Sequence, residues 1–164
     1  MKNLYKCAAN DVLENMTNYR VRVEKPTIIK AYKSQKLSAK ILLNNIYWYI
    51  ITRGKYRVWC VYDEAKIIHT SYVVPKCGKF SFLDKDDFEI GPCYTDTVYR
   101  GKGIYPAILF SISLNVAKND GNIYMIVDSD NKSSIRGIEK AGFKILPGVV
   151  KVNSLKKWIY YPNE

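Results

Sequence analysis

The stretch that decides the fold is Tyr99-Arg100-Gly101-Lys102-Gly103-Ile104-Tyr105-Pro106. Before it, the aromatic and β-branched residues of Phe88–Thr95 predict a strand. After it, apolar residues recur every four positions and predict a helix over residues 104–118. Pro106 falls in the first turn of that helix, where a missing N–H costs nothing. The two glycines therefore lie in a turn between a strand and a helix N-terminus.

This turn has the chemistry of an anion site. The first N–H groups of a helix have no partner within the helix, and the helix dipole adds partial positive charge there. Gly101 and Gly103 lack the Cβ atoms that would hold a diphosphate away, and Arg100 and Lys102 add positive charge. An exposed basic turn explains the same residues equally well. A P-loop is excluded because its motif is absent, and Pro106 replaces the third glycine of the dinucleotide fingerprint.

Two segments together resemble the GCN5-related N-acetyltransferases (GNAT). Residues 100–104, R-G-K-G-I, match the common form of the family's first motif, [QR]-x-x-G-x-[GA], and Tyr105 replaces the small residue that usually follows. Residues 131–143 resemble the second motif, N-x-x-[AS]-x-x-x-Y-E-K-x-G-F, with Ile138 in place of its tyrosine. The matching positions are Asn131, Ser134, Glu139, Lys140, Gly142 and Phe143. The two segments cover residues 87–143, about a third of the chain.

The resemblance implies a mixed α/β fold, formed by one domain over residues 1–164. A central, mostly antiparallel twisted sheet would contain a splayed parallel strand pair and carry flanking helices. A coenzyme A thioester, expected to be acetyl-CoA, would lie in the splay as donor substrate, and no metal is implied. The donor-binding residues that the resemblance implies are Cys93, Tyr94 and Thr95 for the pantetheine, Arg100, Gly101, Lys102, Gly103, Ile104 and Tyr105 for the pyrophosphate, and Asn131 and Ser134 near the thiol.

The resemblance also implies direct transfer, in which the amine attacks the thioester without a covalent enzyme intermediate. The amine must be neutral to attack, so a group has to accept its proton. Glu89 precedes the donor on its strand and His69 lies on the strand before, while an ordered water chain is the alternative to both. Because Ile138 replaces the motif tyrosine, the thiolate would be protonated by Tyr94, Tyr99 or Tyr105, or would leave unassisted.

The acceptor is predicted less sharply than the donor. Residues 91–106 are similar to acetyltransferases of surface-polysaccharide synthesis, which implies an amino sugar, often linked to a nucleotide diphosphate. A peptide amine, a polyamine or another small amine stays open, and so does a coenzyme A-binding protein without catalysis. The sequence leaves both a monomer and a homodimer possible.

Composition and charge limit which partners, metal sites and cellular locations remain possible for the protein. The formal net charge of +11 favours anionic partners, but the basic residues form no dense run and no nucleic-acid-binding motif is present, so nucleic acid is an improbable partner. Cys7, Cys60, Cys77 and Cys93 are far apart, and with a single histidine they match no zinc site. The N-terminus lacks a signal-peptide h-region, and the longest apolar stretch, residues 46–51, is too short for a membrane span. We therefore expect a cytoplasmic protein.

The rest of the chain predicts further elements from local patterns. Alternation and β-branched residues predict an antiparallel meander, and Gly91-Pro92 predicts a bulge or edge position. A glycine suited to a left-handed cap, Gly121, follows the predicted long helix. The predicted strands are 19–23, 46–52, 56–62, 67–74, 123–127, 143–146 and 157–161, and the predicted helices run from Asn10 or Asp11 to Met16, over 38–44, and from Asp130 or Asn131 to Ala141.

Overall fold

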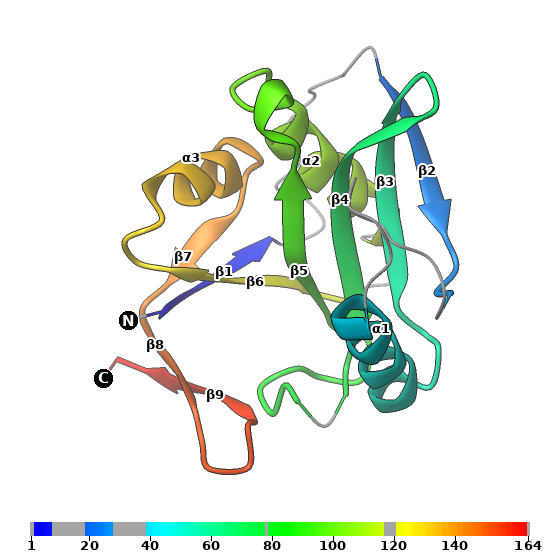
Figure 1. The fold of residues 1–164 in the computed structure, drawn as a ribbon. Coiled ribbons are helices and arrows are strands. Elements are labelled where there is room, and N and C mark those ends of the chain that lie inside the picture. The colour runs from blue at the N-terminus through cyan, green and yellow to red at the C-terminus, as the bar shows by residue number, and fades with distance from the viewer. Residues whose placement is uncertain (1, 8–18, 28–38, 78, 117–120, 164) are drawn as a thin grey trace.

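A computed structural model describes residues 2–7, 19–27, 39–77, 79–116 and 121–163. Within these residues, the main sheet has the strand order β2-β3-β4-β5-β6-β1-β7, and β8 and β9 form a separate hairpin (Figure 1). The strands are β1 (Lys2–Cys7), β2 (Arg20–Glu24), β3 (Arg57–Asp63), β4 (Lys66–Pro75), β5 (Phe88–Thr95), β6 (Ile123–Asp128), β7 (Lys144–Leu146), β8 (Gly148–Val152) and β9 (Trp158–Pro162). The helices are α1 (Ala39–Thr52), α2 (Ile104–Val116), α3 (Lys132–Lys140) and the short 3₁₀ helix η1 (Thr97–Tyr99).

The parallel pair β5–β6 splays apart almost at once. Its register contains only Phe88 opposite Ile123 and Glu89 opposite Tyr124, whereas the other strand pairs of the main sheet are antiparallel. Beyond Glu89 the two strands run in clearly different directions, with β5 rising and β6 crossing the view (Figure 1). The predicted fold class, a mostly antiparallel mixed sheet with one splayed parallel pair, is confirmed.

A bulge in β5 accompanies the splay. Ser71 of β4 pairs with Cys93, and two positions further along β4 the partner is Ile90, so that Gly91 and Pro92 together face one residue of β4. Proline has no N–H to give to a ladder, and an extra residue bends the strand that carries it. The predicted bulge at Gly91-Pro92 is confirmed, and it begins two residues after Glu89, the last residue of β5 that pairs with β6.

Two apolar cores lie on opposite faces of the main sheet. One contains the apolar stripe of α2 predicted from the sequence, and Ile104, Ile108, Ile112 and Val116 are all buried in it. The other contains Trp48 of α1 together with side chains of β3, β4 and the loop before β5. Side chains on neighbouring positions of a strand point to opposite faces, so each residue of β4 and β5 faces either the α1 side or the α2 side.

The prediction of a strand over residues 46–52 is wrong, because this segment completes α1. Its aromatic and β-branched residues favour a strand locally, but burial follows a helical spacing at Asn45, Trp48 and Thr52. The Thr52 hydroxyl donates to the Trp48 carbonyl at 2.7 Å, a bond that only a helical turn brings within reach. Tertiary burial of one helix face has overridden local strand propensity.

Sequence patterns also missed two strands. The N-terminal strand β1 inserts between β6 and β7, where Leu4, Tyr5 and Cys7 are buried, and β8 pairs with β9. Gly121 does not have a left-handed φ. A glycine is required there for a different reason, because a Cβ atom would lie 1.8 Å from the Asp86 carbonyl oxygen. The helix predicted up to Met16, and the last two residues of the predicted 104–118 helix, lie outside the described residues.

Candidate active site

The glycine turn is held in place by the end of the sheet beneath it. The Asp96 carboxylate caps η1 by accepting from the Val98 N–H, and it pairs with the Lys66 ammonium at 2.8 Å. The Tyr99 hydroxyl donates to the Asp63 carboxylate at 2.7 Å. Both bonds reach across to the β3–β4 turn, so the segment that leads from β5 into α2 is fixed at its base.

The turn itself is open to solvent. Gly101 and Gly103 both have φ of 77°, and a Cβ atom added to either would meet nothing within 4 Å. The α2 helix begins directly afterwards at Ile104, so its first N–H groups point out of the helix end toward this open space. Left-handed glycines followed by a helix N-terminus form the kind of main-chain cradle that accepts a phosphate. The residues present therefore fit the diphosphate of coenzyme A.

The second motif packs against the first through a tyrosine and a glycine. A Cβ atom on Gly137 of α3 would lie 2.5 Å from the Tyr105 ring, so this ring occupies space that a side chain at 137 would need. Tyr105, the residue that departs from the first motif, is thus accommodated by the second. Asn131 caps α3 by accepting from the Ser134 N–H at 3.2 Å, as predicted for one of the two alternative caps.

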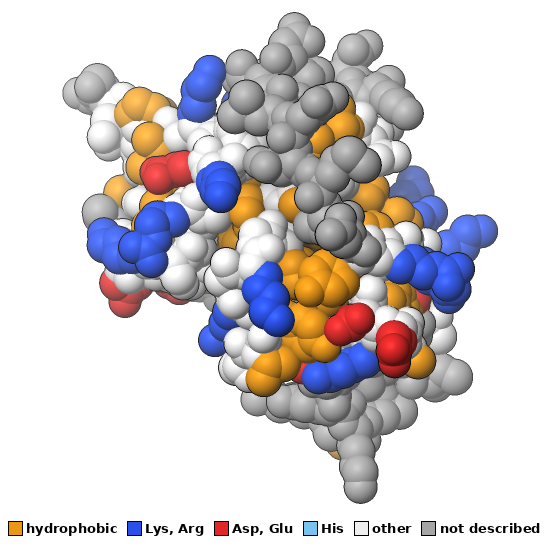
Figure 2. Space-filling view, turned by 90° about the horizontal axis from the view of Figure 1, so that it is seen from above, with side chains coloured by type: hydrophobic (Ala, Val, Ile, Leu, Met, Phe, Trp, Pro, Cys, Tyr) orange, Lys and Arg blue, Asp and Glu red, His pale blue; other side chains and the backbone are white. Residues whose placement is uncertain are grey.

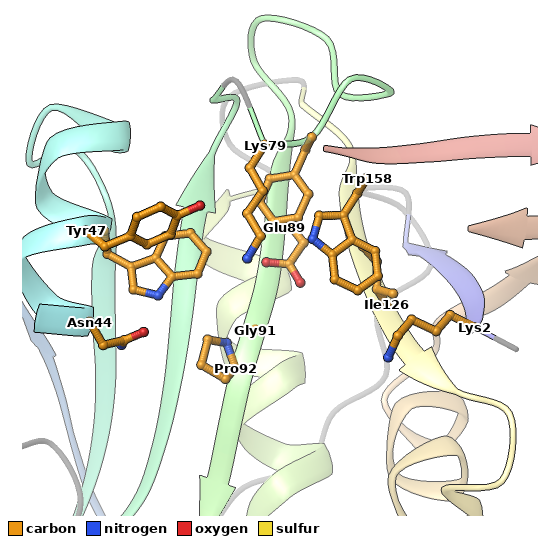
Figure 3. Close-up of a pocket in the computed structure, with 11 residues that line it drawn as sticks. Lys2, Asn44, Tyr47, Lys79, Glu89, Gly91, Pro92, Ile126 and Trp158 are labelled. Atoms are coloured by element: carbon orange, nitrogen blue, oxygen red, sulfur yellow. The ribbon is translucent and has the colours of Figure 1, made fainter. Parts of the chain in front are cut away.

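A pocket of about 330 Å³ opens on the α1 side of the splay (Figure 3). Its polar centre is Glu89, whose carboxylate is shown beside the Lys79 ammonium, with Gly91 and Pro92 below (Figure 3). Its lining comes from six separate parts of the chain, namely β1, α1, the loop before β5, β5, β6 and β9. The lining residues are Lys2, Asn44, Tyr47, Trp48, Lys79, Phe80, Glu89, Gly91, Pro92, Ile126 and Trp158.

The Glu89 carboxyl is buried, and burial raises its pKa from 4.5 to about 8, with the nearby Lys79 ammonium pulling in the opposite direction. A Cβ atom on Gly91 would lie 2.7 Å from Glu89 Oε1. The carboxylate thus rests over the glycine of the bulge, at the point where β5 leaves β6. A carboxyl with such a pKa is mostly ionised only above about pH 8, and its ionised form is a stronger base than an ordinary carboxylate.

His69 faces the α2 side and belongs to a different group of side chains. Its Nδ1 lies 2.7 Å from Thr95 Oγ1, and its Nε2 lies 2.8 Å from Ser71 Oγ. Ser71 donates its proton to Cys93 Sγ at 3.2 Å, so its oxygen is left to accept from His69. The imidazole therefore carries its proton on Nε2 and accepts from the Thr95 hydroxyl at Nδ1.

Burial holds the whole His69 cluster neutral. It lowers the pKa of His69 from 6.5 to about 4, and it raises the pKa of the Cys93 thiol to about 12. Burial likewise raises the pKa of Tyr105 well above its usual value, and this phenol shares a side-chain hydrogen bond with Cys93. The ring centroids of His69 and Tyr105 are 5.9 Å apart.

The structure thus separates the predicted site residues into three groups. Glu89 lines the pocket, whereas His69, Cys93, Thr95 and Tyr105 gather on the other face of the sheet. Tyr94 pairs with Thr70 of β4 and, by strand alternation, faces away from its neighbours Cys93 and Thr95. The third group is formed by the turn residues Arg100, Gly101, Lys102, Gly103 and Ile104. Asn131 and Ser134 lie apart in sequence, at the start of α3.

Sequence reasoning missed the aromatic walls of the pocket and Lys79. Trp48 lies in the segment predicted as a strand. Trp158 is held at the pocket by its main-chain N–H, which donates to the Lys79 carbonyl at 2.7 Å. No local pattern joins residues this far apart. The available signal was Gly91-Pro92, a strand interruption two positions after a carboxylate.

The surface of the described residues mixes basic, acidic and hydrophobic side chains (Figure 2). Viewed from the end toward which β5 runs, Lys and Arg side chains stand in separate groups with acidic and hydrophobic side chains between them (Figure 2). The described residues contain no group of three or more His, Cys, Asp or Glu side chains that could hold a metal ion. None of the described helices has the length and apolar character needed to cross a membrane.

Comparisons with known proteins give a likeness of fold. No protein-family model matches the chain, and no curated protein matches its sequence. An acetyltransferase from the GNAT family from Colwellia psychrerythraea aligns with 88% of this chain and 52% of its own, at 14% identity and a TM-score of 0.66. A GCN5-related N-acetyltransferase from Sphaerobacter thermophilus aligns with 88% of this chain and 48% of its own, at 11% identity and a TM-score of 0.55.

A functionally unknown conserved protein from Staphylococcus epidermidis ATCC 12228 aligns with 88% of this chain and 57% of its own, at 10% identity and a TM-score of 0.58. The chain spans about half the length of these solved structures. Identities this low establish the fold alone. The fold that the two motifs predicted is therefore confirmed, and membership of the GNAT superfamily stays a prediction.

Proposed function

We propose that this chain transfers an acyl group, expected to be acetyl, directly from coenzyme A to a primary amine. The observation that carries the proposal is the placement of a buried carboxylate at the opening of the β5–β6 splay, with an open glycine turn at the far end of the same strand. The turn would hold the diphosphate, the free edge of β5 would hold the pantetheine, and the thioester would reach the pocket. The protein would be cytoplasmic and would take its donor from the coenzyme A thioesters of that compartment.

In this mechanism Glu89 is the proton acceptor. The carboxylate takes a proton from the acceptor ammonium, and the neutral amine attacks the thioester carbonyl. A main-chain N–H of β5 beyond the bulge would stabilise the developing oxyanion. For the departing thiolate, Tyr94 is the better candidate, because by strand alternation it faces the α1 side, on which the pocket opens. Tyr99 already gives its proton to Asp63. Tyr105 lies in the His69 cluster on the other face, where it shares a hydrogen bond with Cys93 and its raised pKa makes it a weaker acid.

For the acceptor, we propose an amino sugar, free or linked to a nucleotide diphosphate. Aromatic side chains such as Trp48 and Trp158 give flat apolar walls of the kind on which sugar rings stack, and Asn44 adds an amide for hydroxyl groups. Lys2 and Lys79 supply positive charge for phosphates. Peptide amines and polyamines are the competing acceptors, and they lack the phosphate that these two lysines would favour.

The test is thioester consumption with acetyl-CoA against four acceptor groups: free amino sugars, nucleotide-linked amino sugars, polyamines and peptide amines. Turnover with any amine supports transfer, and the preferred group identifies the acceptor class. Binding of acetyl-CoA without turnover would instead indicate a coenzyme A-binding protein. A gel shift with nucleic acid that falls with salt and ignores acetyl-CoA would contradict the proposal.

A further inference from the structure

The Lys79 side chain occupies the pocket in which the acceptor amine would bind. Its Nζ lies 4.4 Å from the ring centroid of Trp48, 5.5 Å from that of Phe80 and 5.9 Å from that of Trp158. Figure 3 shows the ammonium directed toward the Glu89 carboxylate. A primary ammonium enclosed by aromatic faces next to a carboxylate is the arrangement expected for a bound amine substrate.

The backbone fixes Lys79 in this position. The main-chain N–H of Trp158 donates to the Lys79 carbonyl at 2.7 Å, and Phe80 forms a β-bridge with Trp158 at the start of β9. The adjoining Phe80 N–H donates to the Cys77 carbonyl at 3.1 Å. The loop that carries Lys79 is therefore tied to the β8–β9 hairpin on one side and to its own turn on the other, and the side chain has a defined direction of entry.

Two features of the pocket suit Lys79 to nucleophilic attack. Burial lowers its pKa, so a larger share of the amine is neutral than on an exposed lysine. The Glu89 carboxylate in the same pocket can accept the proton that the amine has to lose. Lys76 and Lys85 of the same loop are exposed and do not line the pocket.

We infer that Lys79 is itself an acceptor, so that the chain acetylates its own Lys79 Nζ when acetyl-CoA is bound and no external amine fills the pocket. The inference rests on the proposed function. The neutral Nζ attacks the thioester carbonyl carbon, an N–C bond forms and the C–S bond breaks. The proton of the amine passes to the Glu89 carboxylate, and coenzyme A leaves as a thiolate that takes up a proton. The products are an Nε-acetyl-lysine and free coenzyme A.

The experiment incubates the full chain with acetyl-CoA alone and follows intact mass and peptide maps. We expect one acetyl group per chain, located at Lys79, with a half-time independent of protein concentration because the reaction is intramolecular. Glu89→Gln should slow the modification by at least about 100-fold, the low end of general-base effects. Lys79→Arg, which keeps the charge, should remove the adduct, and a saturating amine substrate should protect Lys79.

Lys76 and Lys85 serve as internal controls for chemical acetylation by the thioester. Modification of Lys79 at their rate, or at an equal rate in urea-unfolded chain, would overturn the inference. An unmodified Lys79 in a chain whose melting temperature rises with acetyl-CoA and which turns over an external amine would overturn self-acetylation alone. An unmodified Lys79 in a chain that shows neither response would overturn the proposed function as well.

Discussion

Glu89 and His69 lie on adjacent strands, yet they face opposite sides of the sheet and sit in environments of opposite kind. Both are buried, and burial moves both toward the neutral form: the pKa of Glu89 rises to about 8 and that of His69 falls to about 4. His69 has a side-chain partner at each ring nitrogen, Thr95 and Ser71. Glu89 instead faces a pocket, next to the Lys79 ammonium.

The difference distinguishes a side chain that supports the structure from one that is placed for chemistry. To take a proton from a substrate, His69 would have to give up the hydrogen bond that Thr95 donates, and a charged imidazole there would be buried without a counter-ion in its cluster. Glu89 pays its desolvation cost beside a cavity large enough for a ligand. Buried groups whose perturbed pKa faces a cavity are the better candidates for catalysis.

The largest expected effect is therefore on turnover. Glu89→Gln should lower kcat by about 100-fold or more, since a positioned general base contributes about 10²–10⁴-fold. His69→Gln should leave kcat within about tenfold, because the imidazole contacts the α2 side of the sheet rather than the pocket. Steady-state kinetics with the best amine acceptor measures both.

The matched pair also guards against loss of folding. Both replacements insert the same amide, so circular dichroism and melting curves of the two variants provide the control for each other. A slow His69→Gln enzyme with a normal Glu89→Gln enzyme would reverse the two roles. Equal and small losses in both would assign proton removal to an ordered water chain.

The second prediction concerns stability, on which the two groups have opposite pH dependence. The folded chain binds fewer protons than the unfolded chain at His69, so this residue makes stability fall as the pH drops from 6.5 to 4. The shift of pKa corresponds to about 3 kcal/mol when fully expressed. His69→Gln should flatten the acid side of the curve of unfolding free energy against pH, measured by urea denaturation.

Glu89 acts on the alkaline side. Its folded pKa is raised, so the folded chain binds more protons and stability falls as the pH rises from 4.5 toward 8. Glu89→Gln should remove that slope and leave the acid side unchanged. Coincident curves for the wild type and both variants would show that neither group is buried in the folded chain in solution.

Sequence and structure agree best where local sequence patterns specify each element of a continuous segment. The run from β5 through α2, β6 and α3 follows from two motifs and an apolar stripe, because each element there is specified by its own residues. The helix α1 does not, since its aromatic and β-branched residues favour a strand until Trp48 is buried against the sheet. The strand β1 could not be predicted either, because its place between β6 and β7 depends on pairing with residues more than a hundred positions away.

The residues of the candidate site also divide into those that a local sequence pattern predicts and those that only the fold brings together. The donor turn at Gly103 and the carboxylate Glu89 could be predicted, because each lies next to a local signal, a glycine pair or an interrupted strand. The pocket walls could not. Trp48 comes from a helix, Lys79 from a loop and Trp158 from a separate hairpin, and only the folded arrangement brings them together.

The third prediction concerns the donor, whose diphosphate would bind at the glycine turn between β5 and α2. Acetyl-CoA at about 100 times its Kd should stabilise the fold by about 2.7 kcal/mol, or roughly 5–10 °C in melting temperature for a chain of this size. Gly103→Val should abolish this shift. The control is Gly54→Val in the α1–β3 turn, where φ is 67° and the backbone strain is comparable, with an added close contact of 3.0 Å between the new Cβ atom and the Tyr49 ring. A shift that survives in Gly103→Val would refute the phosphate site.

The smallest expected effect is a displacement of the pH–rate profile. Because Glu89 works as a base when ionised, kcat/KM should rise with pH through about 8. The Lys79 ammonium favours the ionised carboxylate, whereas Cys77, Cys93 and Tyr105, the other titratable groups that interact with Glu89, stay neutral in this range because their own pKa values are raised.

Lys79→Met removes that ammonium while keeping a long apolar side chain, so the rising limb should move to higher pH. An Nε-acetyl group at Lys79 neutralises the same charge, and an acetylated wild-type chain should therefore show a limb displaced in the same direction. A limb that stays in place in Lys79→Met would mean that the charge at 79 does not act on the base. A displacement confined to the acetylated chain would assign the change to the bulk of the acetyl group in the pocket.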